Sequence, residues 1–346
     1  MLSKDFLSKY GLTISVVLIA SYFGTQIKKR YNLEETEEKD YDMIKKYILN
    51  DSPLYGFNKP KLWIHSKYEK NARKWRSFHS RTSDDLNQEY INYTVESLIN
   101  KCGKDFHICL IDDKSFNKLI PGFNKDINSL PEPVKSQERE IAMLLLLHLY
   151  GGMIVPNTFI CMDNLINQYK YLTAFNKPFV FEKINKYCDM KNGKKIKYVP
   201  NIDMIGSNKG CPIIYSLIRD LNSDLEDGHI DSENEFTGET SNKLMNYIKN
   251  SDMISVCGSL IGIKDSKGEE VKLEDLFSSN KEILFSKDKL GILLPREEIL
   301  ERSKYNWFAH LSEKDLLHAN VNIVKYIKLS LISEYVNNTK NVLSSI

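Results

Sequence analysis

The sequence lacks the short motifs that mark several large enzyme classes. It contains no G-x-x-x-x-G-K-[ST] phosphate loop, no H-E-x-x-H metal helix and no G-x-S-x-G nucleophile turn, so the classes that depend on them have no motif support. The net charge is only +2, and the lysine clusters are offset by nearby acids. Because no global basic field would recruit nucleic acid, we expect no nucleic-acid partner.

Cysteine is sparse and scattered. None of the six cysteines belongs to a C-x-x-C pair, so a zinc site or a thioredoxin-type motif has no support from spacing. We expect most of them to be buried thiols. If the bulk of the chain is lumenal, disulfides become possible and the sequons at Asn50, Asn92 and Asn337 could carry glycans. The cysteines are Cys102, Cys109, Cys161, Cys188, Cys211 and Cys257.

One long uncharged run stands near the N-terminus. Residues 10–27 carry no charge over 18 residues and would span roughly 27 Å as a helix, close to the thickness of a bilayer core. Lys9 before the run and the basic residues 28–30 after it could reach the headgroups. We predict that residues 1–30 are a single-pass anchor in a secretory-pathway or viral membrane. A cleaved signal peptide is the alternative, and the balanced flanking charges leave the orientation open.

The rest of the chain has the composition of a globular protein, with 42% hydrophobic and 27% charged residues in a total of 346. Residues 31–58 are typical of a charged stalk that passes into a short amphipathic helix. No internal repeat or Pro- and Gly-rich linker divides the remainder. We therefore predict one domain over residues 59–346, least defined from about residue 225 onward.

The first elements of this domain follow a strand, helix, strand order. "KLWIH" at 61–65 is typical of a strand, the apolar spacing in 83–103 predicts a helix that ends at Gly103, and residues 106–111 alternate as a half-buried strand does. This order is the start of a doubly wound α/β unit. Asp112 and Asp113 follow the second strand, where open α/β sheets bind ligands, although two such acids can also simply begin a turn.

A strongly apolar helix comes next. Ser136 is a suitable N-cap, with Glu138 and Glu140 in the first turn. The helix should be buried on several sides. The pair Gly151-Gly152 would stop it and let the backbone turn into a strand.

Later elements are predicted more coarsely. The stretch 223–242 is acidic and should be an exposed loop. It fails as a calcium loop, because Gly228 in the sixth place would put Ser223 and Leu225 at ligand positions. The other predicted elements are a strand at 177–184, a hairpin turned at Asn192-Gly193, a strand, loop and helix over 201–221, a helix at 241–250, strands near 259–263 and 291–294, and a helix at 320–336.

The run "EIAMLLLLHLYGGMIVPNTFICMDNL" (140–165) resembles the sugar-binding region of family 32-type glycosyltransferases, which are related to capsular polysaccharide synthesis enzymes. Their pattern is an acid, an Arg three residues on, Tyr-Gly-Gly and then Asp-x-Asp, and Glu140 and Tyr150-Gly151-Gly152 match it. Segments 59–75 and 201–214 are similar to two further parts of the family. The resemblance covers roughly residues 59–220 and implies a GT-A-like fold, a Rossmann-type mixed sheet flanked by helices that binds a nucleotide sugar.

The sequence departs from this family where the chemistry is done. Met143 stands at the Arg position, and Pro156-Asn157-Thr158 replace the Asp-x-Asp that holds Mn²⁺ or Mg²⁺ on the pyrophosphate. Hard cations prefer carboxylate oxygens, whereas Asn and Thr offer only neutral oxygens and Pro lacks an N–H. We therefore expect no cofactor, with Mn²⁺ or Mg²⁺ bound only if this altered segment keeps affinity for metal.

Three hypotheses for function remain. The chain is a membrane-anchored, non-catalytic relative used for binding or structure, or an active transferase that stabilises the leaving group without metal, through a cation such as Lys209 or Arg302. In that second case it would move a hexose from a nucleotide sugar to a glycan or protein. The third hypothesis is an unrelated membrane-tethered α/β domain. The candidate substrate-binding residues are Trp63, His65, Asp112, Asp113, Glu140, Gly151, Gly152, Asn157, Thr158 and Asp203.

Two histidine-containing regions have competing interpretations. His148 on the apolar helix is expected to be a packed histidine rather than a ligand. Trp307, Phe308 and His310 could stack a sugar ring or donate a proton, or could cap the core, which is the more common arrangement. A Lys-, Asn- and Ile-rich chain with an anchor and an altered transferase core also resembles membrane proteins of large DNA viruses.

Overall fold

The computed structural model describes the chain over residues 59–66, 88–185, 190–191, 194–227 and 233–331. All of these belong to one compact unit, Gly56–Ile346. The predicted anchor at 10–27 and the stalk at 31–58 lie outside the described residues. Among the residues that are described, no helix is long and apolar enough to cross a membrane.

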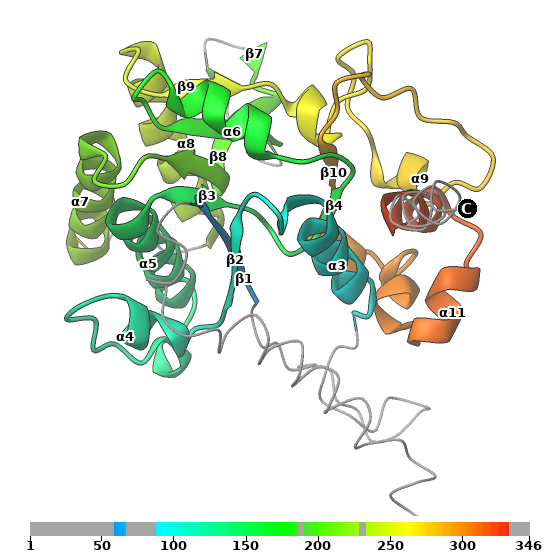
Figure 1. Ribbon diagram of the computed structural model, residues 1–346, viewed down its shortest axis with the longest axis horizontal. Coiled ribbons are helices and arrows are strands. Elements are labelled where there is room, and N and C mark those ends of the chain that lie inside the picture. Colours follow the sequence, from blue (N-terminus) through cyan, green and yellow to red (C-terminus); the bar gives the residue numbers. More distant parts are fainter. Residues whose placement is uncertain (1–58, 67–87, 186–189, 192–193, 228–232, 332–346) are drawn as a thin grey trace, which may run out of the picture. The chain divides into compact units, whose positions relative to one another are not determined.

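A six-stranded mixed sheet lies at the centre of this unit (Figure 1). The strand order is β2-β1-β3-β8-β5-β9, and β8 alone runs antiparallel to the other five. The chain therefore leaves β1 toward one side to form β2 and returns to add β3 on the other side. The strands are β1 (Lys61–His65), β2 (His107–Ile111), β3 (Gly152–Ile154), β5 (Phe179–Ile184), β8 (Tyr198–Ser207) and β9 (Ile254–Val256).

The predicted α/β class and the first two predicted strands are confirmed. β1 pairs in parallel with β2, with Lys61 opposite His107 and His65 opposite Ile111. β1 is buried on both faces, since Leu62, Trp63 and Ile64 are all fully covered. Helices on both sides of a largely parallel sheet require such continuously apolar strands.

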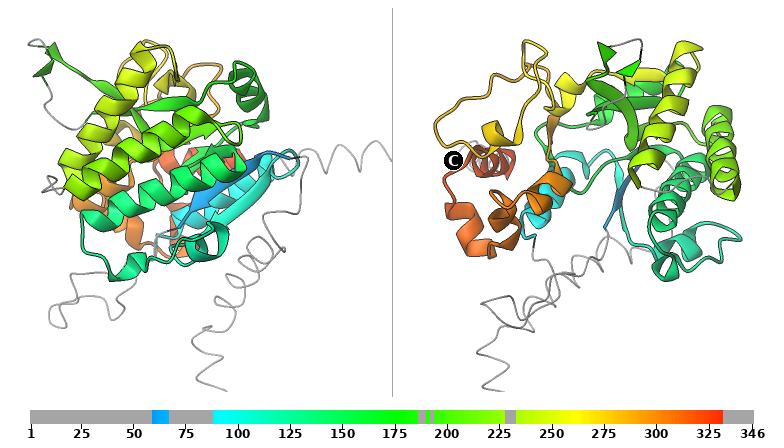
Figure 2. Two further views of the ribbon diagram at one scale, coloured as in Figure 1. Left: turned by 90° about the vertical axis from the view of Figure 1, so that its left-hand side faces the viewer. Right: turned by 180° about the vertical axis from the view of Figure 1, so that it is seen from behind.

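Helices α5, α7 and α8 cover one face of the sheet (Figure 2). Their apolar sides and the sheet form one hydrophobic core that includes Trp63, Leu144 and Leu217. Polar contacts join α7 to α8, because the Tyr247 hydroxyl donates to Asp220 over 2.7 Å and Lys243 pairs with Asp224 at 2.8 Å. The longer helices are α3 (Tyr90–Cys102), α5 (Val134–Tyr150), α6 (Ile166–Thr173), α7 (Pro212–Asp227) and α8 (Glu233–Lys249).

A second core gathers the C-terminal part around α3 and a small antiparallel pair. β4 pairs with β10, and Tyr90 of α3 stacks near Phe308 with ring centroids 5.3 Å apart. A helix also occupies residues 322–331. The short elements are α4 (Ser115–Leu119), η1 (Ile127–Ser129), β4 (Phe159–Cys161), β6 (Met190–Lys191), β7 (Lys194–Lys195), η2 (Gly258–Ile261), α9 (Leu273–Leu276), β10 (Gly291–Leu293), α10 (Arg296–Glu301), η3 (Asn306–His310) and α11 (Glu313–His318).

The start of α5 differs from the prediction. The helix begins at Val134, two residues before the expected cap. Ser136 lies inside it, and both its N–H and its hydroxyl donate to the Glu132 carboxylate, over 3.1 and 2.7 Å. The Glu132 carboxylate therefore accepts the hydrogen bonds at the start of the helix, a role that the sequence predicted for the side chain of Ser136.

Two further predictions were wrong. The stretch 223–242 is not a loop in its described part, because α7 continues to Asp227 and α8 already begins at Glu233. Thr240 and Ser241 of α8 are buried, at 1% and 3% exposure, so tertiary packing outweighs the polar composition. The strand expected at 259–263 is instead the 3-10 helix η2, and the sheet strand precedes it.

The glycine pair after α5 makes the sheet possible. Gly151 and Gly152 have φ values of +70° and +104°, which L side chains rarely adopt. A Cβ on Gly152 would lie 2.1 Å from the Lys61 carbonyl oxygen, and one on Gly151 would lie 2.7 Å from the Lys209 nitrogen. The pair therefore allows β3 to approach β1 while the chain reverses from the helix.

We expect Gly152→Ala to lower the free energy of unfolding by about 3 kcal/mol or more, since backbone strain and overlap with Lys61 add together. Gly210→Ala is the matched control. Its φ is +71° but a Cβ there meets nothing within 4 Å, so only about 1–2 kcal/mol of strain applies. Urea unfolding curves measure both variants, and equal losses would contradict the proposed overlap.

Candidate functional site

A cavity of about 240 Å³ lies at the carboxyl ends of the parallel strands. It is somewhat smaller than typical ligand pockets of about 300–1,000 Å³, so it would enclose only part of a nucleotide sugar. Its polar and charged lining residues are His65, Ser136, Arg139, Glu140, Asn157, Thr158, Lys183, Asn201, Asp203, Arg296, Glu297 and Glu298.

The strand order accounts for the position of the cavity. His65 is the last residue of β1, and residues 154–158 line the cavity directly at and after the end of β3. Because the chain leaves β1 in one direction and adds β3 on the other side, the loops after these two strands diverge. Open α/β sheets bind ligands in the crevice that such a reversal creates.

The segment 156–158 forms one wall of the cavity with its backbone held in place. The Thr94 hydroxyl of α3 donates to the Asn157 carbonyl over 2.5 Å, and the Thr158 hydroxyl donates to the Leu294 carbonyl over 3.2 Å. Asn157 and Thr158 are 7% and 4% exposed. The Thr158 hydroxyl is therefore engaged with the protein.

This donor set does not fit a divalent cation. Pro156 has no side-chain oxygen, Asn157 offers a neutral one, and the hydroxyl of Thr158 already donates to a carbonyl. Within the described ranges, no group of three or more His, Cys, Asp or Glu side chains is arranged to hold a metal ion.

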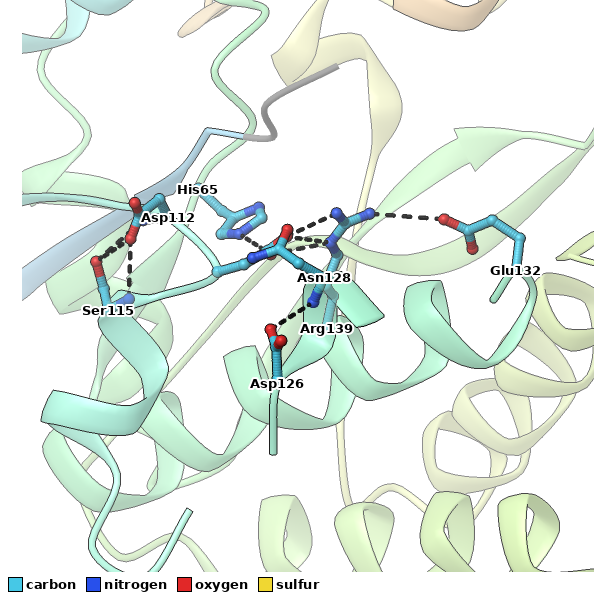
Figure 3. Close-up of polar contacts among 8 residues, drawn as sticks. His65, Asp112, Ser115, Asp126, Asn128, Glu132 and Arg139 are labelled. Carbon is cyan, nitrogen blue, oxygen red and sulfur yellow. Dashed lines mark hydrogen bonds and ion pairs between the residues drawn. The ribbon is translucent and has the colours of Figure 1, made fainter. Parts of the chain in front are cut away.

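A buried charged network adjoins the cavity (Figure 3). Arg139 of α5 binds Asp113 in a bidentate manner, with Nε at 2.9 Å from Oδ1 and Nη2 at 2.7 Å from Oδ2. His65 Nε2 lies 3.0 Å from the same Oδ1, and its ring stacks on Phe116 at 5.4 Å. Glu132 lies 3.7 Å from Arg139 Nη1.

Ionisation of Asp113 is favoured in this network. Burial raises the pKa of the Asp113 carboxyl, but hydrogen bonds from His65 and Arg139 outweigh that effect and hold its pKa well below the usual value. The carboxylate fixes both the arginine and the histidine. It thereby orients two side chains that line the cavity.

A second ion pair stands across the cavity. Lys183 Nζ of β5 lies 2.5 Å from Asp203 Oδ2 of β8. Burial lowers the pKa of Lys183, but attraction by Asp203 and Glu297 outweighs it, so that the pKa lies above its usual value. The lysine is therefore a fixed positive charge, partly exposed to the cavity.

Arg296 is the third cation of the lining. It begins α10, is 9% exposed, and its Nε donates to Gln88 over 3.0 Å. Sequence reasoning missed Arg139, Lys183 and Arg296. The available signals were the charged pair Glu182-Lys183 in the strand "FVFEKI" and an arginine next to Glu140 in a buried helix.

The structure brings together half of the predicted site residues. Five of them line the cavity: His65, Glu140, Asn157, Thr158 and Asp203. The other five do not belong to its lining and have structural contacts of their own: Trp63, Asp112, Asp113, Gly151 and Gly152.

Two of these structural contacts are specific. The indole N–H of Trp63, a fully buried residue, donates to the Gly151 carbonyl over 3.0 Å. The Asp112 carboxylate accepts from the N–H of Ser115 at the start of α4 over 2.9 Å. Asp112 therefore begins a turn, which is the structural alternative that the sequence left open beside ligand binding.

The other candidates do not belong to the lining either. Phe308 is fully buried in the second core, which favours the core-capping interpretation of its cluster. His148 Nδ1 lies 3.1 Å from the Cys211 carbonyl, as a packed histidine would. Lys209 and Arg302 do not line the cavity, and Arg302 pairs with Glu274 and Glu298.

Comparisons with known proteins give only distant likenesses. No protein-family model matches the chain, and no curated protein matches it. Among solved structures, PaToxG glycosyltransferase is similar over 64% of this chain and 82% of its own, with 13% identity and a TM-score of 0.32. Galactosyltransferase LgtC, solved with donor and acceptor sugar analogues, is similar over 58% of this chain and 75% of its own, with 10% identity and a TM-score of 0.31.

Both similar structures are glycosyltransferases, but likenesses this weak assign neither a family nor an activity. Nothing in the comparisons points to family 32 in particular or to a viral source. The description of the fold therefore depends on the strand order and the packing alone.

We expect Asp113→Asn to lower the free energy of unfolding by about 3 kcal/mol at neutral pH, because Arg139 would lose its buried ionic partner. The folded pKa of Asp113 is depressed, so its stabilisation is present above the unfolded pKa of about 3.9 and is lost as the pH falls below that value. The difference between wild type and variant should shrink accordingly.

Asp112→Asn is the control, since that exposed side chain caps a short helix and should cost about 1 kcal/mol or less. Urea unfolding at neutral pH and below about pH 4 measures both variants. A difference for Asp113→Asn that does not change with pH would contradict the role of the carboxylate.

Proposed function

We propose that this protein is a glycosyltransferase-like binding protein, which holds a nucleotide sugar in the cavity through side chains and without a divalent cation. In this proposal it is a degenerate, non-catalytic relative of the family 32-type, GT-A-like enzymes. Residues 10–27 hold it in a membrane as a single-pass anchor. Its partners are the membrane, a nucleotide sugar and a glycan or protein.

One observation carries the proposal. Residues 156–158, which stand where the family pattern has Asp-x-Asp, line a cavity beside His65 and Glu140 at the reversal of the strand order. The position is the one at which sheets of this kind bind ligands. Its side chains carry none of the carboxylates that the family pattern would use to hold a metal.

The cavity offers three cations to an anionic ligand, but four carboxylates also belong to its lining, so we expect only moderate affinity. Lys183 and Arg139 contribute positive charge, but each is already paired, with Asp203 and Asp113 respectively. A diphosphate would have to compete with these carboxylates for the cations, or share them. Such a site can bind a nucleotide sugar, but it holds little uncompensated positive charge for a leaving group.

Metal-independent transfer is the second candidate. The observation that favours it is the presence of Lys183 and Arg296 in the lining, since fixed cations can stabilise a leaving phosphate. Binding without turnover supports the first proposal, and turnover in the absence of metal supports this one.

We expect UDP- or GDP-sugars to bind the protein at micromolar concentration, with the same affinity in Mn²⁺ and in EDTA. Isothermal titration measures this for each nucleotide sugar. Binding that requires Mn²⁺ would contradict the interpretation of residues 156–158. The absence of binding under both conditions would leave the hypothesis of an unrelated α/β domain.

The Lys183→Met variant should weaken this binding about tenfold or more, because it removes a cation and leaves the Asp203 carboxylate without its partner in the cavity. Lys118→Met is the matched control, since Lys118 is exposed on α4 and does not line the cavity. Equal affinities of the two variants would place the ligand elsewhere.

Turnover is tested on the same samples by following release of UDP or GDP without and with Mn²⁺. Our proposal expects no release above the spontaneous rate. Release in EDTA that Lys183→Met abolishes would establish metal-independent transfer instead.

A further inference from the structure

The loops at the end of the sheet opposite the cavity form a surface of their own. We call this surface the amino edge, because the parallel strands begin there. Close contacts join its loops: Lys59 Nζ donates to the Lys104 carbonyl over 2.6 Å, and Asn208 Nδ2 donates to the Thr173 carbonyl of α6 over 3.1 Å. The start of α6 also belongs to it, since Asn164 Nδ2 donates to Asp105 over 2.6 Å.

Exposed lysines outnumber acids on the amino edge. None of these lysines makes an ion pair within the part of the chain that the structure describes; they are Lys59, Lys104, Lys170, Lys177 and Lys209. The acids near them are Asp105, Asp163 and Asp252. Asp105 and Asp163 accept hydrogen bonds from Asn164. Positive charge therefore prevails on this edge and is not neutralised by pairing.

Exposed aromatic side chains accompany these lysines. Tyr171 and Phe175 at the C-terminal end of α6 are 64% and 55% exposed, and their rings lie 5.5 Å apart. Tyr215 at the start of α7 is 57% exposed beside His148. Lysine beside exposed aromatic rings is the composition that proteins present to a membrane interface, where the ring enters the headgroup region and the amine meets anionic lipid.

The chain enters the domain at this same edge. Lys59 lies two residues before the start of β1, and the uncharged run 10–27 comes earlier, separated from it by residues 28–58. If the run is in a membrane, this connection keeps the domain close to the bilayer at high effective concentration. A weak electrostatic attraction then suffices to orient the domain.

We propose that the amino edge docks on the anionic surface of the membrane that carries the N-terminal run. The cavity opens at the opposite edge of the sheet and would face away from the lipid, where a soluble ligand can reach it. This inference rests on the membrane anchor of the proposed function, but it does not depend on which ligand the cavity binds.

Lysine acylation footprinting of the full-length protein tests the proposal. The protein is reconstituted in phosphatidylcholine vesicles or in vesicles with about 30% phosphatidylserine, treated with a membrane-impermeant acylating reagent and analysed by mass spectrometry. We expect Lys104, Lys170, Lys177 and Lys209 to react about threefold or more slowly on the anionic vesicles, and to recover at about 1 M salt. Lys114 and Lys118, which follow β2 at the carboxyl edge, should react equally in all cases.

Two charge-reversal variants of equal net charge sharpen this test. Lys177→Glu with Lys209→Glu should abolish the protection of Lys104 and Lys170, whereas Lys114→Glu with Lys118→Glu should leave it unchanged. All four substituted side chains are exposed, and the wild-type footprint stands even if a variant folds poorly.

Three results would overturn the proposal. Equal reactivity of the amino-edge lysines on neutral and anionic vesicles would exclude lipid charge as the partner. Stronger protection of Lys114 and Lys118 would assign the opposite orientation. Equal protection by soluble heparin without vesicles would assign the edge to a soluble polyanion.

Discussion

The close approach of β3 to β1 is the constraint on which the site depends. It requires a residue without a side chain at Gly152, since a Cβ there would overlap the Lys61 carbonyl. The Trp63 indole then holds the preceding turn through the Gly151 carbonyl. Once β3 lies in register beside β1, the residues that follow it must lie next to His65, which ends the neighbouring strand. The wall of the cavity is thus a consequence of backbone packing several residues away.

The cavity that results combines an uncharged wall with compensated charges. Arg139 and Lys183 come from α5 and β5, and their carboxylate partners come from the residues after β2 and from β8. Four different elements therefore meet in two ion pairs. Such pairs order their side chains but leave little net field, because each cation has an anion within hydrogen-bonding distance. In the proposed function, the ligand would replace or bridge these pairs.

Local sequence patterns correctly predicted the elements whose burial in the folded domain matches those patterns. Alternation and continuous apolar runs identified β1, β2 and β5, because both faces of these strands are buried. The prediction failed at 223–242, where polar residues of α8 are buried by contact with other elements. It also failed at the start of α5, where the capping acceptor comes from Glu132, four residues before Ser136. In both places the conformation depends on a contact with residues elsewhere in the chain, which the local composition does not reveal.

The sequence by itself determined the α/β class, the turn at the glycine pair and the uncharged side chains at residues 156–158, since each depends on residue type at a local position. Only the tertiary structure decided which polar residues meet. It brought His65, Glu140 and Asp203 to one cavity, moved Asp113 into a buried ion pair, and added Arg139, Lys183 and Arg296. The physical reason is that strand order and register, which arise from long-range packing, determine which strand ends are adjacent.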